Sequence, residues 1–226
     1  MIPWVQLDTA VGEAGAETLR LMRRGGEFSI MCGAIELMNS RLSGSEEALA
    51  TLACDRLGPR PGLRMLIGGL GMGFTLRAGL AVLAADAQVV VAELSPAVIA
   101  WARGPLAQVF AGSLEDARVR VEAADVGDLI RSGEGAYDAI LLDVDNGPHG
   151  LSRTSNDGLY SRKGLEAAAR ALRPGGVLAV WSSAPDARFT ARLEAAGYRV
   201  EEARTRARGN GRGARHVIWL AVKPAR

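Results

Sequence analysis

Between residues 63 and 222 the chain alternates short apolar runs with longer segments of helical periodicity. Runs such as VVVA and AILL are continuously apolar, which is typical of parallel strands that helices cover on both faces. Between the first five runs, apolar positions recur every three to four residues, as they do in helices. The expected strands are 63–67, 88–93, 119–125, 137–144, 175–183, 198–205 and 216–222. The expected helices among them include 72–84, 96–103 and 157–172.

The last part of the chain departs from this alternation. A helical segment at 187–197 leads into two strands, which are joined by the Arg/Gly loop RARGNGRGAR at 206–215. Two consecutive strands with a short linker form an antiparallel hairpin. We therefore predict a doubly wound α/β domain with a seven-stranded, mostly parallel, Rossmann-like sheet and an antiparallel last strand. This arrangement resembles the class I methyltransferase fold.

A smaller unit precedes this domain. EFSIM (27–31) and AIELM (34–38) flank a turn at Gly33, which is the pattern of a β-hairpin. The segment 43–57 reads as a helix, because Ser43 and Glu46 have capping-box spacing and an apolar stripe follows them. The Gly- and Pro-rich segment GPRPG (58–62) then marks a boundary in the chain. We expect an N-terminal hairpin and helix at 1–58 and a nucleotide-binding domain at 59–226.

Composition narrows the class of protein. The chain has 226 residues, 48% of them hydrophobic and 23% charged, which suits one sizeable globular domain. A net charge of +2 gives no indication of a nucleic-acid or membrane partner. Cys32 and Cys54 have no neighbouring His, so we expect no disulfide framework and no metal site. With no secretory signal and no run of eighteen apolar residues, we expect a soluble, cytoplasmic protein.

The first strand is followed by a glycine-rich turn. Gly69, Gly71 and Gly73 form G-x-G-x-G, which allows a sharp turn and the close approach of a ligand to the backbone. A strand-to-helix turn without a ligand would need the same glycines. The dinucleotide fingerprint requires a glycine where Phe74 stands, and no G-K-[ST] follows as in a phosphate-binding loop. The turn alone does not identify the ligand.

Two acids end the next two strands. Glu93 lies where a carboxylate can accept both ribose hydroxyls, and Asp125 lies where a carboxylate can accept the adenine amine. Each alone is also consistent with a solvated charge at a strand end. Because such sheets bind ligands at the carboxyl ends of their strands, the glycines and the two acids together favour an adenosine ligand.

The fourth strand ends in LLDVDNGP. Asp143 is expected to project from the carboxyl end of this strand, beside the bound ligand. An acidic side chain at this position could act as a general base or bind a cationic substrate. Asp145 is a further candidate for binding the substrate amine. Asp145 and Asn146 also suit a cap or turn, since Gly147 and Pro148 follow them.

These segments together resemble the spermidine synthase-like aminopropyltransferases. The resemblance covers most of the chain and includes the N-terminal hairpin, GGLGMG, VVVAELSPAVIAWAR, VEAADVGDLI, YDAILLDVDNGP and LYSRKGLEAAARALRPGGVLAV. It implies decarboxylated S-adenosylmethionine as the co-substrate and a small-molecule amine as the acceptor. Asp143 matches the family's catalytic aspartate, which helps to deprotonate the attacking amine. A homodimer that pairs through the N-terminal part is also implied.

The chain departs from the family pattern at three places. Gly71 stands where the family has an aspartate that grips the amine of the aminopropyl group. The family's Tyr-His-Glu cluster is here Ser45-Glu46-Glu47, which keeps only Glu47, and the loop with Asp145 lacks the usual Asp-Pro pair. The donor is therefore left open between S-adenosylmethionine and its decarboxylated form. Methyl transfer from S-adenosylmethionine and a noncatalytic nucleoside-binding role stay as alternatives to aminopropyl transfer.

Several further residues have both a functional and a structural interpretation. Glu46 and Glu47 could reach an amine substrate or simply favour the dipole of their helix. Tyr160 could line the acceptor pocket or anchor the next helix, and His149 could be an acid/base group or a surface residue. Five arginines in or beside the last loop could bind an anion or be solvated, and no aromatic residues are interleaved with them. These are Arg204, Arg206, Arg208, Arg212 and Arg215.

Overall fold

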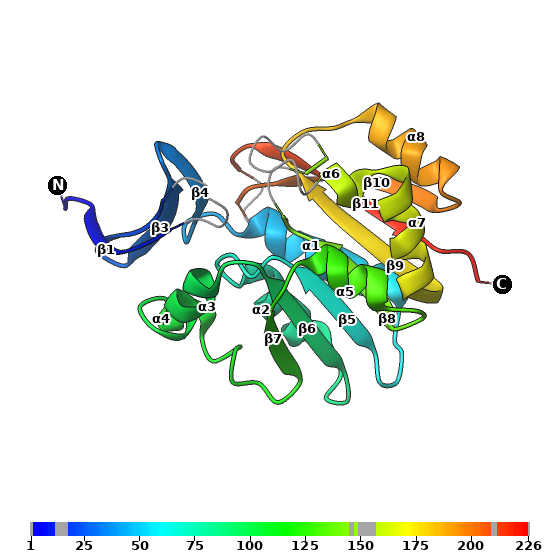
Figure 1. Ribbon diagram of the computed structural model, residues 1–226, viewed down its shortest axis with the longest axis horizontal. Coiled ribbons are helices and arrows are strands. Elements are labelled where there is room, and N and C mark those ends of the chain that lie inside the picture. The colour runs from blue at the N-terminus through cyan, green and yellow to red at the C-terminus, as the bar shows by residue number, and fades with distance from the viewer. Residues whose placement is uncertain (1, 12–17, 145–146, 149–156, 209–211, 226) are drawn as a thin grey trace.

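The computed structural model describes residues 2–11, 18–144, 147–148, 157–208 and 212–225. The N-terminal part forms a four-stranded antiparallel sheet in the order β1-β2-β3-β4 (Figure 1). Its strands are β1 (Val5–Ala10), β2 (Leu19–Arg24), β3 (Glu27–Cys32) and β4 (Ile35–Asn39). The predicted hairpin is β3 and β4, and Gly33 in their turn has a φ of +55°. The two strands before it were not predicted.

The remaining strands form the predicted seven-stranded sheet, in the order β10-β11-β9-β8-β5-β6-β7. Its strands are β5 (Arg64–Gly68), β6 (Gln88–Glu93), β7 (Val119–Ala123), β8 (Tyr137–Leu142), β9 (Leu172–Ser182), β10 (Arg199–Arg206) and β11 (Arg215–Val222). Neighbouring strands from β7 to β9 are parallel, whereas β11 is antiparallel to both β9 and β10. The predicted fold class is therefore confirmed.

Helices cover both faces of this sheet. They are α1 (Gly44–Leu57), α2 (Phe74–Val82), α3 (Pro96–Arg103), α4 (Ala107–Phe110), α5 (Val126–Ser132), α6 (Asp157–Tyr160), α7 (Arg162–Ala171) and α8 (Ala187–Ala195). Side chains alternate between the faces along each strand. In β5, Met65 and Ile67 join a core with α1, α2 and α3, whereas Leu66 joins a second core with α5, α7 and α8. The domain thus has three layers.

Helix α1 belongs with the larger sheet by its packing. Leu49, Ala50 and Ala53 are fully buried in the same core as Met65 of β5, and α1 packs against α2 and β9. Residues of the small sheet, such as Phe28, reach this core as well. The expected N-terminal unit 1–58 therefore shares its core with the domain that follows it.

A buried carboxylate joins three strands at the edge of the sheet opposite the glycine turn. Asp138, at the start of β8, is 4% exposed. It forms ion pairs with Arg60 at 3.2 Å and Arg173 at 2.9 Å, and it accepts a hydrogen bond from the backbone N–H of Arg64 at 2.9 Å. One side chain thus connects β5, β8 and the start of β9.

We expect Asp138→Asn to lower the free energy of unfolding by about 1–3 kcal/mol, since it leaves buried hydrogen-bonding groups without their charged partner. Urea denaturation of wild type and variant measures the difference. Asp128→Asn is the control, because the Asp128–Arg131 pair is exposed and such pairs contribute little. Equal stability of wild type and D138N would contradict the role assigned to this carboxylate.

Candidate active site

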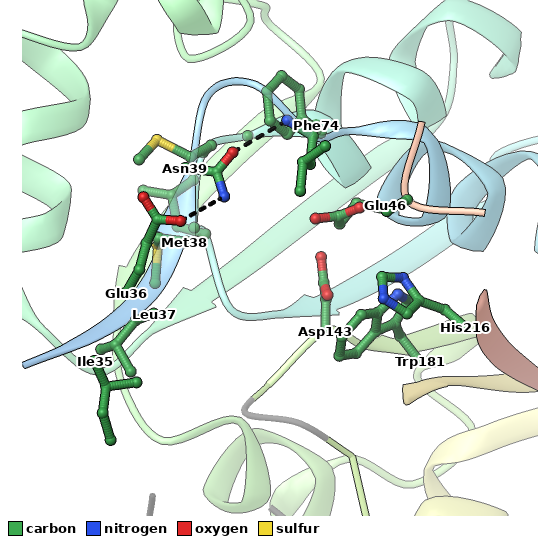
Figure 2. Close-up of a pocket in the computed structure, with 16 residues that line it drawn as sticks. Ile35, Glu36, Leu37, Met38, Asn39, Glu46, Phe74, Asp143, Trp181 and His216 are labelled. Atoms are coloured by element: carbon green, nitrogen blue, oxygen red, sulfur yellow. Dashed lines mark hydrogen bonds between the residues drawn. The ribbon is translucent and has the colours of Figure 1, made fainter. Parts of the chain in front are cut away.

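The sheet has a topological switch point between β5 and β8. After β5 the chain continues to β6 on one side, and after β8 it continues to β9 on the other. Sheets of this kind bind ligands in the crevice that opens at the carboxyl ends of these two strands. A cavity of about 280 Å³ lies here. It is lined by residues from β4, α1, the glycine turn, β9 and β11, and by Asp143, which follows β8 (Figure 2).

The glycine turn follows β5 directly and needs its glycines for two reasons. Gly69, Gly71 and Gly73 have φ values of +88°, +50° and +77°, in the left-handed region that favours glycine. A Cβ on Gly69 would lie 2.6 Å from the carbonyl oxygen of Asp143, and one on Gly73 would overlap the ring of Phe110. Of the three glycines, Gly71 and Gly73 line the cavity.

Glu93, at the end of β6, holds this turn in place. Its Oε2 accepts a hydrogen bond from the backbone N–H of Leu70 at 3.0 Å, and its Oε1 accepts one from the N–H of Ser95 at 2.9 Å. The side chain therefore ties the glycine turn to the start of α3. The sequence predicts a ribose-binding residue at this position and gives no signal for the bond to Leu70.

Asp125 follows β7 and is the N-cap of α5. Its Oδ1 accepts a hydrogen bond from the backbone N–H of Gly127 at 2.6 Å. The residue is partly buried and lies after the strand next to β6, as predicted. One carboxylate oxygen thus serves the helix, and the predicted contact with adenine would use the other.

Asp143 leaves the end of β8 and lines the cavity. Its backbone N–H donates to the carbonyl of Gly68 at 3.0 Å, and its Oδ2 accepts a hydrogen bond from the hydroxyl of Thr75 at 2.7 Å. Burial, together with the negative charge of Glu46, raises the pKa of Asp143 to about 7, although the Thr75 bond opposes the shift. The carboxyl group can therefore exchange a proton near neutral pH.

Glu46, in the first turn of α1, faces Asp143 across the cavity (Figure 2). Its Oε2 accepts a hydrogen bond from the hydroxyl of the buried Ser45 at 2.7 Å, and the Nδ1 of His216 lies 2.8 Å from the same hydroxyl oxygen. Burial raises the pKa of Glu46 and lowers that of His216. Ser43, the expected capping partner of Glu46, makes no side-chain cap bond.

The other predicted residues lie as follows. Glu47 is exposed and is absent from the described lining of the cavity. Tyr160 is 2% exposed; its ring packs edge-on against Phe189, and its hydroxyl is 3.4 Å from the carbonyl of Val144. Asp145 and His149 lie outside the described residues.

Ser45, Thr75 and His216 were not singled out in the sequence, although Ser45 stands at a position of the family's Tyr-His-Glu cluster. In the Arg/Gly loop, Ala207 lines the cavity, whereas Arg206 donates a hydrogen bond to the carbonyl of Gly213. Within the described ranges, no group of three or more His, Cys, Asp and Glu side chains could hold a metal ion. None of the described helices is long and apolar enough to cross a membrane.

Comparison with known proteins identifies relatives. The family model of the spermine/spermidine synthase domain matches residues 61–188. Polyamine aminopropyltransferases from Mycobacterium tuberculosis are 37% identical over 123 residues, which is 50% of this chain and 23% of theirs. One from Nitrosomonas europaea is 36% identical over 98 residues, 43% of this chain and 29% of that protein. The matched part is therefore less than a third of each of these curated relatives.

Solved structures share the fold. A spermidine synthase in complex with the transition-state analogue AdoDATO superposes with a TM-score of 0.77 and 18% identity, over 98% of this chain and 74% of that one. The spermidine synthase from Thermotoga maritima gives a TM-score of 0.74 and 17% identity, over 98% and 73% of the two chains. At these identities the superpositions establish the architecture, and the residues of the cavity have to be interpreted by their own chemistry.

Proposed function

The chain belongs to the spermine/spermidine synthase family, and from that premise we propose that it transfers the aminopropyl group of decarboxylated S-adenosylmethionine to a small-molecule amine. The observation that carries the proposal is Asp143. This carboxyl group lies at the switch point of the sheet, beside the glycine turn and on the wall of the cavity, and its pKa is raised to about 7. A base with this pKa can take up a proton at neutral pH.

Besides a base, aminopropyl transfer mainly requires that the protein align the two substrates. The sulfonium of the donor is already activated, so the attacking nitrogen needs a lone pair and an in-line position, and alignment can contribute about 7–11 kcal/mol. The ammonium of the acceptor gives one proton to Asp143. The nitrogen lone pair then forms a bond to the aminopropyl carbon, the C–S bond breaks, and its electron pair stays on sulfur. The products are methylthioadenosine and a protonated secondary amine.

The donor would lie along the carboxyl edge of the sheet. Gly69, Gly71 and Gly73 would leave room for its methionine-derived part next to the backbone, Glu93 would accept from the ribose hydroxyls, and Asp125 from the adenine amine. The contacts of Glu93 and Asp125 with backbone N–H groups support this assignment, since they fix both carboxylates at the ends of neighbouring strands.

Methyl transfer from S-adenosylmethionine is the second candidate, and Gly71 favours it. A donor that keeps its carboxylate meets no acidic side chain at this position, whereas the family pattern has an aspartate there. Purified protein is to be given radiolabelled decarboxylated donor with putrescine, and then S-adenosylmethionine with a panel of amines. Product from the second set alone would overturn aminopropyl transfer. If calorimetry detects no binding of either donor or of methylthioadenosine, both transferase proposals fail in favour of a noncatalytic role.

We expect kcat/KM for the acceptor to fall about tenfold for each pH unit below pH 7 and to level off above it. The sign follows from the raised pKa of Asp143, because the protonated carboxyl that predominates below about 7 cannot accept the amine proton. Initial rates from pH 5 to 9 measure the profile. This profile holds with donor below saturation; once donor saturates the site, its positive sulfonium favours the carboxylate, so the limbs of kcat/KM for the acceptor and of kcat should lie at lower pH. A profile that is flat through pH 7 would remove Asp143 as the base.

The oligomeric state and the location in the cell are two further predictions. A homodimer is to be tested by light scattering during size-exclusion chromatography. The cytoplasmic location is to be tested by cell fractionation of the natural host.

A further inference from the structure

The cavity carries an excess of negative charge. Its described titratable side chains are Glu36 from β4, Glu46 from α1, Asp143 directly after β8 and His216 from β11, and its described lining includes no Lys or Arg. Glu36 is neutralised from outside the cavity, since Arg41 contacts both of its oxygens at 2.8 and 2.9 Å. Glu46 and Asp143 receive hydrogen bonds from neutral hydroxyls instead. The unbalanced charge of the cavity therefore lies on these two side chains.

The two carboxylates come from different elements and point toward one another (Figure 2). Ionised together, they repel each other in a partly enclosed space. A cation between them removes this repulsion, and an ammonium has three N–H donors with which to reach both sides. The arrangement suits a primary amine that is bound in its charged form.

Building on the proposed function, we propose that Glu46 is the second carboxylate of the acceptor site, which binds the attacking ammonium opposite Asp143 and selects cationic amines. When Asp143 takes the first proton, a remaining N–H of the amine donates to Glu46. This bond keeps the nitrogen in place while its lone pair attacks the aminopropyl carbon and the C–S bond breaks. The positive charge that develops on nitrogen is then stabilised by Glu46 as the sulfonium loses its own.

Ser45 and His216 act as positioning residues for Glu46. The Ser45 hydroxyl has one proton, which it donates to Glu46, so the proton between Ser45 and His216 belongs to the Nδ1 of His216. Burial lowers the pKa of His216, which keeps the imidazole neutral at pH 7, and Trp181 packs edge-on against it at 4.8 Å. Glu46 is thereby held toward the cavity by a residue of its own helix and by β11.

The test is Glu46→Gln, which keeps the shape of the side chain and removes its charge. We expect KM for putrescine to rise about tenfold or more, since a charge-assisted hydrogen bond becomes a neutral one. KM for the donor is expected to stay unchanged. We also expect the acid limb of kcat/KM to move to lower pH, because the charge of Glu46 contributes to the raised pKa of Asp143. Asp55→Asn is the matched control, since it removes an exposed carboxylate from the same helix.

Two outcomes would overturn the proposal. One is an E46Q enzyme with the wild-type KM for putrescine. The other is a raised KM with an unmoved pH limb, which would show that Glu46 only shapes the cavity. If E46Q does not fold by circular dichroism, Ser45→Ala takes its place. The loss of the hydroxyl should raise the pKa of Glu46 further, so this variant should also bind putrescine more weakly at pH 7, and unchanged binding would count against the proposal.

A readout without turnover separates this proposal from the proposed function. Calorimetry with putrescine, in the presence of methylthioadenosine, compares the affinities of wild type and E46Q. One result is that wild type binds putrescine, E46Q does not, and no donor is consumed. This result would support the role of Glu46 in the acceptor site and contradict aminopropyl transfer. If wild type turns over and both proteins bind putrescine equally, only the role of Glu46 fails.

Discussion

Asp143→Asn is expected to lower kcat by about 10²–10⁴-fold, the range that a positioned general base contributes. The amide has nearly the shape of the carboxyl group and can still accept the hydrogen bond from Thr75, but it cannot take up the amine proton. The affinity for methylthioadenosine, measured by calorimetry, is expected to stay within a factor of a few of wild type. Full turnover by this variant would contradict the mechanism.

The same variant is expected to be more stable than wild type at alkaline pH. The pKa of Asp143 is raised from 3.8 to about 7 in the folded protein. The folded state therefore holds the proton more tightly than the unfolded state, and this stabilising contribution is lost as the pH rises from about 4 through 7. Asparagine does not titrate, so the melting temperature of D143N should exceed that of wild type at pH 8 by more than at pH 4. Equal differences at both pH values would show that burial of the charge costs no stability.

Gly69→Ala is expected to abolish nucleoside binding and to destabilise the fold. With φ at +88°, a side chain costs about 1–2 kcal/mol in backbone conformation. The added Cβ would lie 2.6 Å from the carbonyl oxygen of Asp143, and relief of such an overlap costs about 1–3 kcal/mol more. The movement must displace either the glycine turn or the base. Calorimetry with methylthioadenosine and urea denaturation measure the two effects.

Gly62→Ala is the control for this substitution. Gly62 has a φ of +57°, but a Cβ on it would meet no atom within 4 Å. This variant therefore carries the backbone cost without the overlap, and it should bind the nucleoside as wild type does. Similar losses in both variants would mean that the close approach of Gly69 to Asp143 is unimportant.

The sequence predicts the larger sheet better than the small one, for a physical reason. Strands β6 and β8 are buried between helices, so their apolar runs are continuous and easy to recognise. Strand β1 is mostly exposed, and β2 reads LRLMRR, in which basic residues interrupt the pattern. β1 pairs with β2, and β2 with β3. This pairing depends on contacts with the rest of the sheet, and periodicity within a short window does not detect such contacts.

Some residues of the candidate site can likewise be predicted from the sequence, and others cannot. The glycine turn and Asp143 can be predicted because each directly follows a recognisable strand, and the switch point brings them together. The link between Ser45 and His216 joins residues 171 positions apart, and nothing in the sequence near either residue points to the other. The choice between Glu46 and Glu47 also needed the structure, because adjacent residues in a helix point in directions about 100° apart.

The place of β11 in the sheet has a consequence for how the protein is made. This strand follows β10 in the chain but lies between β9 and β10. While the chain emerges from the ribosome, β9 therefore keeps an open edge, with Val177, Leu178 and Val180 in the strand, until β11 has been synthesised. His216 lies on that same strand, so the nascent protein can have neither a complete sheet nor a complete cavity until β11 has emerged. In the interval before β11 pairs with it, the unpaired edge of β9 exposes the nascent chain to aggregation.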